Sequence, residues 1–140
     1  MNLYIEIEVY NREFHSKLLV AMEGASRGMD VYFGRVKKYV MRDFFFPGLI
    51  LDKSITPSPQ RLMEMETCKK KNFIYTSLDE ESGLINNNNN YLKLRYSNEV
   101  LKLVSKVFCW GKWDFNNLNK RFNKYKKKFI LSGNPRIDFW

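Results

Sequence analysis

Three neighbouring stretches decide the fold: LYIEIEV at residues 3–9, HSKLLVAMEGASRG at residues 15–28, and VYFG at residues 31–34. The first alternates apolar and acidic residues around Ile5 and Ile7, a pattern that predicts a β-strand. In the second, Leu18, Leu19, Met22 and Ala25 share one helical face, and Gly28 stands where a glycine often ends a helix. The third is a short strand closed by Gly34. Together they predict a βαβ unit with tight loops.

The same alternation continues along the rest of the chain. Pro57 and Pro59 suit the first turn of a helix, and Ser97 is a suitable N-cap for another. The remaining strands are expected at 48–51, 72–76, 107–110 and 128–131, and the remaining helices at 36–45, about 57–71, 98–105 and 113–124. The asparagine tract at 86–90 is interpreted as a flexible loop tip without a function. The sequence therefore predicts one α/β domain over residues 1–140, a Rossmann-like three-layer fold with a mostly parallel sheet.

Composition narrows the classes of function. The 140 residues are 44% hydrophobic, which suits a packed domain, and 24 Lys and Arg against 15 Asp and Glu give a net charge of +9. This balance favours anionic partners such as nucleic acid, phosphorylated sugars or an anionic membrane surface. Cys68 and Cys109 are too few for a structural zinc site. Glu6 interrupts the apolar core that a signal peptide needs, and no apolar run has the length of a membrane span, so we expect a cytoplasmic location.

Ligands of open parallel sheets bind beyond the carboxyl ends of the strands, where polar residues recur in this chain. The strongest catalytic candidate is the acidic triplet Asp79-Glu80-Glu81. Repulsion among the three carboxylates would raise the pKa of at least one, which then serves as a general acid or base; the alternative is a solvated turn. The other candidates, for substrate binding, are Arg12, Glu13, Lys53, Gly111, Gly133, Asn134 and Arg136.

The segment Gly133-Asn134-Pro135-Arg136 has a composition that suits binding of an anionic group. Glycine permits close approach of the backbone, proline fixes the exit direction, and Arg136 can hold a phosphate or carboxylate with two hydrogen bonds. A generic turn is the alternative interpretation. The loop after the first strand lacks a G-x-G-x-x-G fingerprint and the chain lacks a P-loop, which argues against dinucleotide binding of the usual kind and against P-loop chemistry. His15 is the only histidine, and we interpret it as a residue of the helix start rather than as a base.

Lysines form two clusters, 69–71 and Lys124 with 126–128. They are interpreted either as a solvated helix end and strand entry or as a docking surface for anionic lipid headgroups. Nucleic acid is the less favoured partner, because the aromatic residues are not interleaved with the basic ones as a stacking platform requires.

The ordered motifs resemble those of bacterial surface-polysaccharide biosynthesis proteins. The set runs in order through Arg12-Glu13, Lys17-Leu18-Leu19, Arg27-Gly28, Leu51-Asp52-Lys53-Ser54, Leu78-Asp79-Glu80-Glu81, Phe108-Cys109-Trp110-Gly111 and Ser132-Gly133-Asn134-Pro135-Arg136-Ile137-Asp138. This family resembles glycosyltransferases of the GT-B type, which have two Rossmann-like domains facing a cleft. More distantly, the chain is similar to CDP-glycerol glycerophosphotransferases and, in its Gly-Asn-Pro segment, to UDP-sugar epimerases, while some relatives resemble Kdo transferases.

The resemblance implies an N-terminal, acceptor-side domain of a transferase that moves a sugar from a nucleotide-sugar donor to a glycan acceptor. It implies Glu80 or Glu81 as the acid or base, Asp79 as a residue that shapes the turn, and Arg12, Lys53 and Arg136 as anchors for anionic groups. Asp138 is expected at a hinge or helix cap. No metal or resident cofactor is expected. The nucleotide-sugar domain is expected to lie outside this chain, in a longer polypeptide or a partner subunit, so that the chain alone is inactive.

Two other interpretations stay open. One is a non-enzymatic basic module that binds nucleic acid or an anionic membrane surface, based on the charge of +9 and the lysine clusters. The other is an isolated Rossmann-like domain that binds a small molecule or a partner chain.

Overall fold

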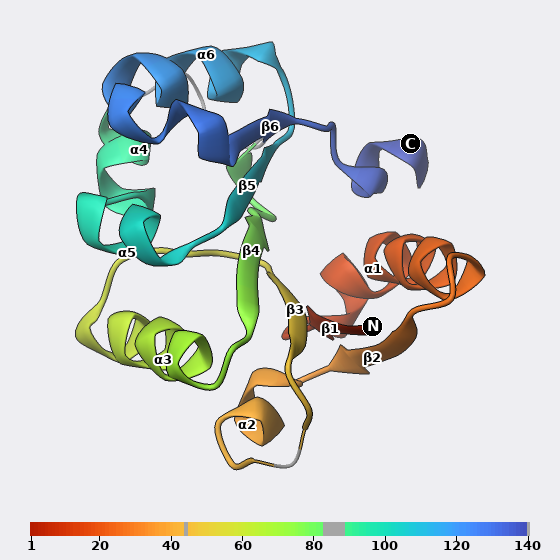
Figure 1. Ribbon diagram of the computed structural model, residues 1–140. Coiled ribbons are helices and arrows are strands. Elements are labelled where there is room, and N and C mark those ends of the chain that lie inside the picture. Colours follow the sequence, from red (N-terminus) through yellow and green to blue (C-terminus); the bar gives the residue numbers. More distant parts are fainter. Residues whose placement is uncertain (44, 83–88, 140) are drawn as a thin grey trace.

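The computed structural model describes residues 1–43, 45–82 and 89–139. Its strands form one six-stranded sheet, in which every neighbouring pair is parallel and the order is β2-β1-β3-β4-β5-β6 (Figure 1). The strands are β1 (Asn2–Glu6), β2 (Asp30–Gly34), β3 (Gly48–Asp52), β4 (Ile74–Leu78), β5 (Lys106–Cys109) and β6 (Phe129–Leu131). The predicted Rossmann-like α/β class is confirmed.

Helices connect the strands. They are α1 (Tyr10–Ser26), α2 (Lys37–Val40), α3 (Pro59–Lys70), α4 (Asn89–Arg95), α5 (Asn98–Leu103) and α6 (Lys112–Arg121), with the 3-10 segments η2 (Asn123–Lys128) and η3 (Pro135–Phe139). The predicted N-cap Ser97 is confirmed, since its hydroxyl accepts from the Val100 N–H. Pro59 lies in the first turn of α3 as predicted, whereas Pro57 precedes the helix, whose N-cap is Ser58; the Ser58 hydroxyl accepts from the Arg61 N–H.

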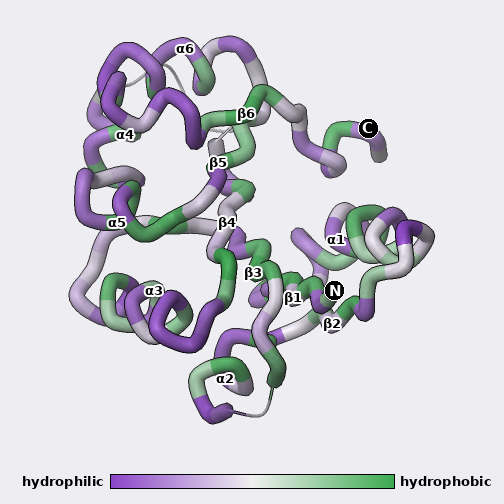
Figure 2. Tube along the Cα trace, in the orientation of Figure 1, coloured by the Kyte–Doolittle hydropathy of each residue, from purple (hydrophilic) through white to green (hydrophobic). Residues whose placement is uncertain are grey.

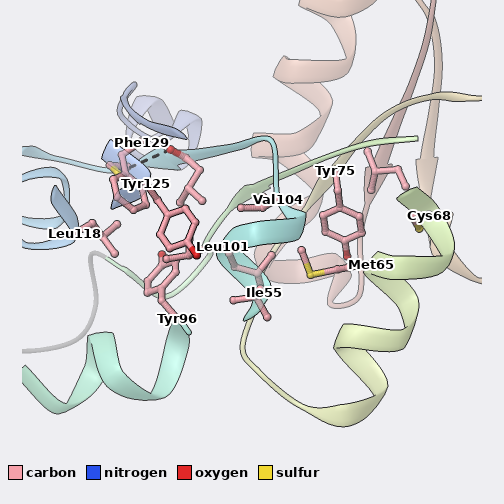
Figure 3. Close-up of a cluster of buried hydrophobic side chains, with 14 of the residues drawn as sticks. Ile55, Met65, Cys68, Tyr75, Tyr96, Leu101, Val104, Leu118, Tyr125 and Phe129 are labelled. Carbon is pink, nitrogen blue, oxygen red and sulfur yellow. Dashed lines mark hydrogen bonds between the residues drawn. The ribbon is translucent and has the colours of Figure 1, made fainter. Parts of the chain in front are cut away.

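The helices cover the two faces of the sheet unequally. Figure 1 shows α1 on one side and α3, α4, α5 and α6 on the other. The larger hydrophobic core lies beneath these other helices and joins Met65, Tyr75, Leu101, Leu118 and Phe129 (Figure 3). A smaller core around Ile5, Ala21 and Leu78 lies beneath α1. Beside it, an apolar hollow of about 340 Å³ opens between α1 and the region of Gly133 and Pro135.

The chain reverses its direction of winding at β1. From β1 it moves outward to β2 and then returns across β1 to β3, so that β1 pairs with both strands in parallel. A Cβ on Gly48, at the start of β3, would lie 2.5 Å from the carbonyl oxygen of Asn2, so glycine is required for this close pairing. The crevice at such a reversal, beyond the carboxyl ends of the strands, is the usual ligand position in this fold class.

Several element boundaries differ from the sequence prediction. Strand β1, expected over residues 3–9, ends at Glu6, because Val9 already stands at the N-cap of α1. Helix α1 begins at Tyr10, five residues before His15, because Glu13 closes its first turn. Strand β4 begins at Ile74, because Asn72 has the left-handed φ of 61° and extends the end of α3. Helix α2 ends at Val40, short of the predicted residue 45. Helix α4 was not predicted; it begins inside the asparagine tract, whose residues 86–88 lie outside the described part of the chain.

Candidate functional site

A charged cavity of about 230 Å³ lies at the carboxyl edge of the sheet, over the reversal between β1 and β3. We call it the carboxyl-edge cavity. Its walls are formed by Glu8, Arg12, Lys53, Ser54, Thr56, Arg61, Glu80, Glu81 and Arg95. These are guanidinium, ammonium, carboxylate and hydroxyl groups, the kinds of group that bind polar and anionic ligands.

The first turn of α1 supplies Arg12. The carboxylate of Glu13 is fully buried; it accepts the backbone N–H of Glu8 at 2.8 Å and holds the guanidinium of Arg12 at 2.9 Å. Negative charge in the first turn of a helix is favourable, and the N–H of Glu8 has no helical partner. Glu13, predicted as a substrate-binding residue, therefore lies behind Arg12 and positions it.

Strand β3 delivers a buried acid, Asp52, to the same edge. Its carboxylate accepts from Lys37 Nζ at 3.0 Å, from Arg61 Nη1 at 2.6 Å and from the hydroxyl of Tyr75. Burial, and after it the charge of Asp52, raises the pKa of Tyr75 well above its ordinary value, so the phenol stays a neutral donor. The result is an Arg61 side chain fixed at the cavity wall, which the sequence analysis missed because Arg61 lies nine residues beyond Asp52 on α3.

An ion pair joins the two loops at the reversal itself. Lys53 follows β3 and pairs with Glu8, which follows β1. Partial burial lowers the pKa of Lys53. The carbonyl of Lys53 also accepts the backbone N–H of Glu80 at 3.1 Å, which ties the β3 loop to the acidic triplet.

Each carboxylate of the acidic triplet lies next to at least one cation. Glu80 is 2% exposed, and its Oε1 lies 2.7 Å from Nζ of Lys17, which is 1% exposed. Asp79 is buried and receives two hydrogen bonds from Arg95, at 2.6 and 2.9 Å. Glu81 is the accessible member, with 39% of its side chain exposed. The sequence analysis expected three carboxylates that repel one another. In the structure, nearby cations compensate their negative charge.

Glu81 shares both of its cations with buried acids. Its carboxylate lies 3.4 Å from Arg12 and 3.2 Å from Arg95. Arg12 is also held by Glu13, and Arg95 by Asp79. Glu81 can therefore turn away from both arginines and leave each of them paired. Lys17 and Arg95 were missed in the sequence analysis, because a charged residue on a helix carries no signal of its partner.

The predicted Gly-Asn-Pro-Arg segment lies beside the cavity and not in its wall. Gly133 has a left-handed φ of 79°, and Asn134 accepts the backbone N–H of Arg136 at 2.9 Å. Nη1 of Arg136 lies 3.5 Å from the carbonyl oxygen of Glu80, so this arginine reaches the backbone of the triplet. Gly111 precedes the first turn of α6 and does not line the cavity.

Aromatic side chains gather on the surface around the first turn of α1. Tyr10 and Phe14 stack with ring centroids 4.4 Å apart, and Phe33 at the end of β2 lies 5.9 Å from Phe14. Tyr10 is 60% exposed and Phe33 is 42% exposed. We call these three side chains the aromatic shelf; Arg12, which lines the cavity, lies on the same helix, but its guanidinium faces Glu81 and none of the three rings is part of the cavity wall.

The excess positive charge lies elsewhere. Residues 1–90 hold 12 Lys and Arg and 12 Asp and Glu, whereas residues 91–140 hold 12 and 3. A second groove, of about 470 Å³, lies in this basic part of the chain. Among the described residues no acid lines it, and its wall is formed by Leu92, Lys93, Asn117, Lys120 and Arg121. The carboxyl-edge cavity is therefore the place where both acids and bases meet.

Comparison with protein-family models gives no match, and a search among curated proteins gives no significant match. Within the described ranges, no helix is long and apolar enough to cross a membrane, and no three His, Cys, Asp or Glu side chains come together as metal ligands. Cys68 and Cys109 are free, buried thiols, and burial raises the pKa of Cys68 to about 11.

Proposed function

We propose that this chain is the acceptor-side domain of a glycosyltransferase that builds bacterial surface polysaccharide. It acts in the cytoplasm and transfers a sugar from a nucleotide-sugar donor to a glycan acceptor. The observation that carries the proposal is the carboxyl-edge cavity, in which the accessible carboxylate of Glu81 stands among cations and hydroxyl groups, while the other accessible carboxylate, Glu8, is paired with Lys53. The resemblance of the ordered motifs to those of surface-polysaccharide biosynthesis proteins supports the same reaction.

Glu81 is the acid or base in this proposal. A general base must come within hydrogen-bonding distance of the hydroxyl that it deprotonates, and Glu81 is the exposed member of the triplet. Glu80 is enclosed with Lys17 and supports the cavity floor. Asp79 fixes Arg95. Of the two glutamates that the sequence offered as acid or base, we therefore assign contact with the acceptor to Glu81.

The cations hold the anionic groups of the substrates. Arg12, Arg61 and Arg95 each keep a buried carboxylate partner, which fixes the guanidinium while part of it faces the cavity. Planar guanidinium groups bind carboxylates and phosphates through two parallel hydrogen bonds. Such a wall suits an acidic sugar or the phosphate of a nucleotide sugar, with Lys53 as a further point charge.

The aromatic shelf receives a sugar ring of the acceptor. The face of an aromatic ring is electron-rich, so it attracts the polarised C–H groups of a pyranose. Tyr10 and Phe33 are exposed, and Tyr10 lies on the same first turn of α1 as the cavity residue Arg12. The nucleotide-sugar donor is brought to Glu81 by a second domain or a partner subunit.

Sugar transfer by the native protein tests the proposal. The mass of that protein and the reading frame beyond Trp140 establish which polypeptide supplies the donor side. Donor hydrolysis and transfer to surface oligosaccharides are then measured for Glu81→Gln, Glu80→Gln and the control Glu66→Gln, an exposed glutamate on α3. We expect Glu81→Gln to lower kcat by two or more orders of magnitude, as is typical for loss of acid–base catalysis, and Glu66→Gln to leave it unchanged.

The result separates the roles of the two glutamates. Equal activity of Glu81→Gln and wild type, with Glu80→Gln also unchanged, would show that the triplet does not act in catalysis. A loss in Glu80→Gln alone, with normal folding, would move the catalytic role to the buried position. No transfer or donor hydrolysis by the native protein with any nucleotide sugar would overturn the function itself.

A further inference from the structure

Lysines gather at the opposite end of the sheet from the cavity. Helices α3 and α5 end there, β5 begins there, and η2 leads there into β6. Figure 2 shows η2 as a hydrophilic segment next to the hydrophobic β6. We call six exposed lysines at this end the amino-edge patch: Lys69, Lys70, Lys102, Lys106, Lys126 and Lys127.

Contacts across four elements join these lysines into one surface. Lys106 Nζ donates to the carbonyl of Lys127 at 2.9 Å. Lys128, which follows Lys127, donates to the carbonyls of Leu101, Lys102 and Val104 at the end of α5, at 2.7, 3.2 and 2.6 Å. Burial lowers the pKa of Lys128, and the nearby charge of Lys69 on α3 lowers it further. The ends of α3, α5 and η2 therefore lie together.

The charge of the patch is left uncompensated. Among the residues that the structure describes, none of the six lysines forms an ion pair with a carboxylate. Glu66 and Glu99 lie one helical turn before Lys69 and Lys102, and the charge of Lys102 acts on Glu99, but two acids beside six lysines leave the patch positive. A helix dipole favours a cation in the last turn of a helix. It explains Lys102, but it does not account for Lys106, Lys126 and Lys127, which are outside α-helices.

We propose that the amino-edge patch docks the protein on an anionic lipid bilayer. Lysine ammonium groups are compact point charges, which suit a diffuse negative surface such as a layer of lipid phosphates. The six lysines offer no bidentate contacts, and Tyr125, the ring beside Lys124 and Lys128, is buried and offers no open face for stacking to nucleic acid. This inference rests on the amino edge alone and holds whether or not the carboxyl-edge cavity transfers sugars.

Docking in this way fixes the orientation of the domain. A five-residue strand spans about 16 Å, so the bilayer and the carboxyl-edge cavity lie at opposite ends of the sheet. The cavity then opens away from the lipid, toward soluble substrates or the far end of a membrane-anchored chain.

Vesicle sedimentation tests the proposal. The purified chain is spun with vesicles of phosphatidylcholine alone and with vesicles that contain increasing phosphatidylglycerol, at low and high salt. The test variant replaces Lys69, Lys102 and Lys127 by Gln, since no hydrogen bond of their side chains is found within the described residues. The control variant removes the same charge at three exposed residues of the β2–β3 connection, Arg35, Lys38 and Arg42.

Wild type is expected to bind only the anionic vesicles, and to be released by salt. Each removed patch lysine is expected to weaken partitioning about fivefold, so that the triple variant loses about a hundredfold. The control variant is expected to bind like wild type. Three results would overturn the proposal: no binding to anionic vesicles, an equal loss in the control variant, or tighter binding to duplex DNA or RNA than to vesicles at the same salt concentration.

Discussion

The two edges of the sheet differ in how their charged side chains are paired. At the carboxyl edge, six cations each have a carboxylate partner, and several of these acids are fully buried. At the amino edge, the six patch lysines and Lys128 face solvent or donate to backbone carbonyls, and their neighbour Lys71 is paired with the exposed Asp43. Because a buried charge without a partner is costly and an exposed one is not, the carboxyl edge is fixed by its ion pairs while the amino edge is free to meet a partner.

This difference changes how the net charge of +9 is understood. Residues 1–90 are neutral in total, so the charge of the whole chain says little about the ligand of the carboxyl-edge cavity. The basic character belongs to the C-terminal part of the chain and to the amino edge. A binding experiment with a polyanion would therefore report on the amino edge and leave the candidate catalytic cavity untested.

The strongest test of the comparison removes Lys17. Lys17→Met leaves the carboxylate of Glu80 buried without its cation, and we expect the free energy of unfolding to fall by about 3–5 kcal/mol. Urea denaturation followed by circular dichroism measures the change. Lys127→Met, at the amino edge, is the control and should stay within about 0.5 kcal/mol of wild type. Equal effects of the two variants would remove the contrast between the edges.

A second substitution tests the backbone at the start of β3. Gly48→Ala places a methyl group 2.5 Å from the carbonyl oxygen of Asn2, and separating the two strands is expected to cost about 1–3 kcal/mol. Gly24→Ala is the matched control, since its methyl group meets the mobile end of the Leu3 side chain and alanine favours the helix. Thermal unfolding of both variants should show the larger loss for Gly48→Ala; the reverse order would contradict the tight pairing of β1 with β3.

A third substitution tests whether one lysine of the amino edge, Lys128, stabilises the fold. Lys128 donates to three carbonyls at the end of α5, and Lys128→Met is expected to lower the free energy of unfolding by about 1 kcal/mol, because partial exposure weakens these bonds. Hydrogen exchange should quicken in α5. Lys126→Met, which removes an exposed lysine, should change neither quantity; a matching loss there would show that Lys128 is no different from its neighbours.

The smallest effect concerns pH. Burial raises the pKa of Glu6, so the native state keeps a proton that the unfolded chain has lost, and stability falls as pH rises from about 4.5 through the raised pKa. Glu6→Gln should remove this slope, so that the variant gains stability relative to wild type as pH rises from acid to neutral. Urea denaturation across this pH range measures it.

Glu99 gives the opposite sign and serves as the control. A hydrogen bond from Ser97 lowers the pKa of this exposed glutamate, so its contribution to stability is present above about pH 4.5 and is lost as pH falls through the lowered pKa. Glu99→Gln should therefore lose stability at neutral pH relative to acid. If the difference in unfolding free energy from wild type changed with pH in the same direction in both variants, the direction of the pKa shift assigned to one of the two carboxylates would be wrong.

The sequence by itself determined the fold class and the order of the strands along the chain. Hydrophobic periodicity is a local property, so LYIEIEV at residues 3–9 and the helical face around Leu18 could be recognised without any knowledge of distant contacts. The same reasoning placed Arg12, Lys53, Glu80 and Glu81 near one edge, because polar residues after parallel strands meet there. It could not rank the two glutamates, since adjacent residues in a sequence carry no sign of which one is enclosed.

Only the tertiary structure decided which charges meet. Glu80 is buried because α1 brings Lys17 over it, and Glu81 remains accessible because its arginines are already held by Glu13 and Asp79. Arg61 and Arg95 reach the cavity from helices whose positions depend on the crossovers between strands. The amino-edge patch likewise forms when the ends of α3, α5 and η2 come together. Electrostatic energy depends on distance through space, which chain separation does not reveal until the sheet has formed.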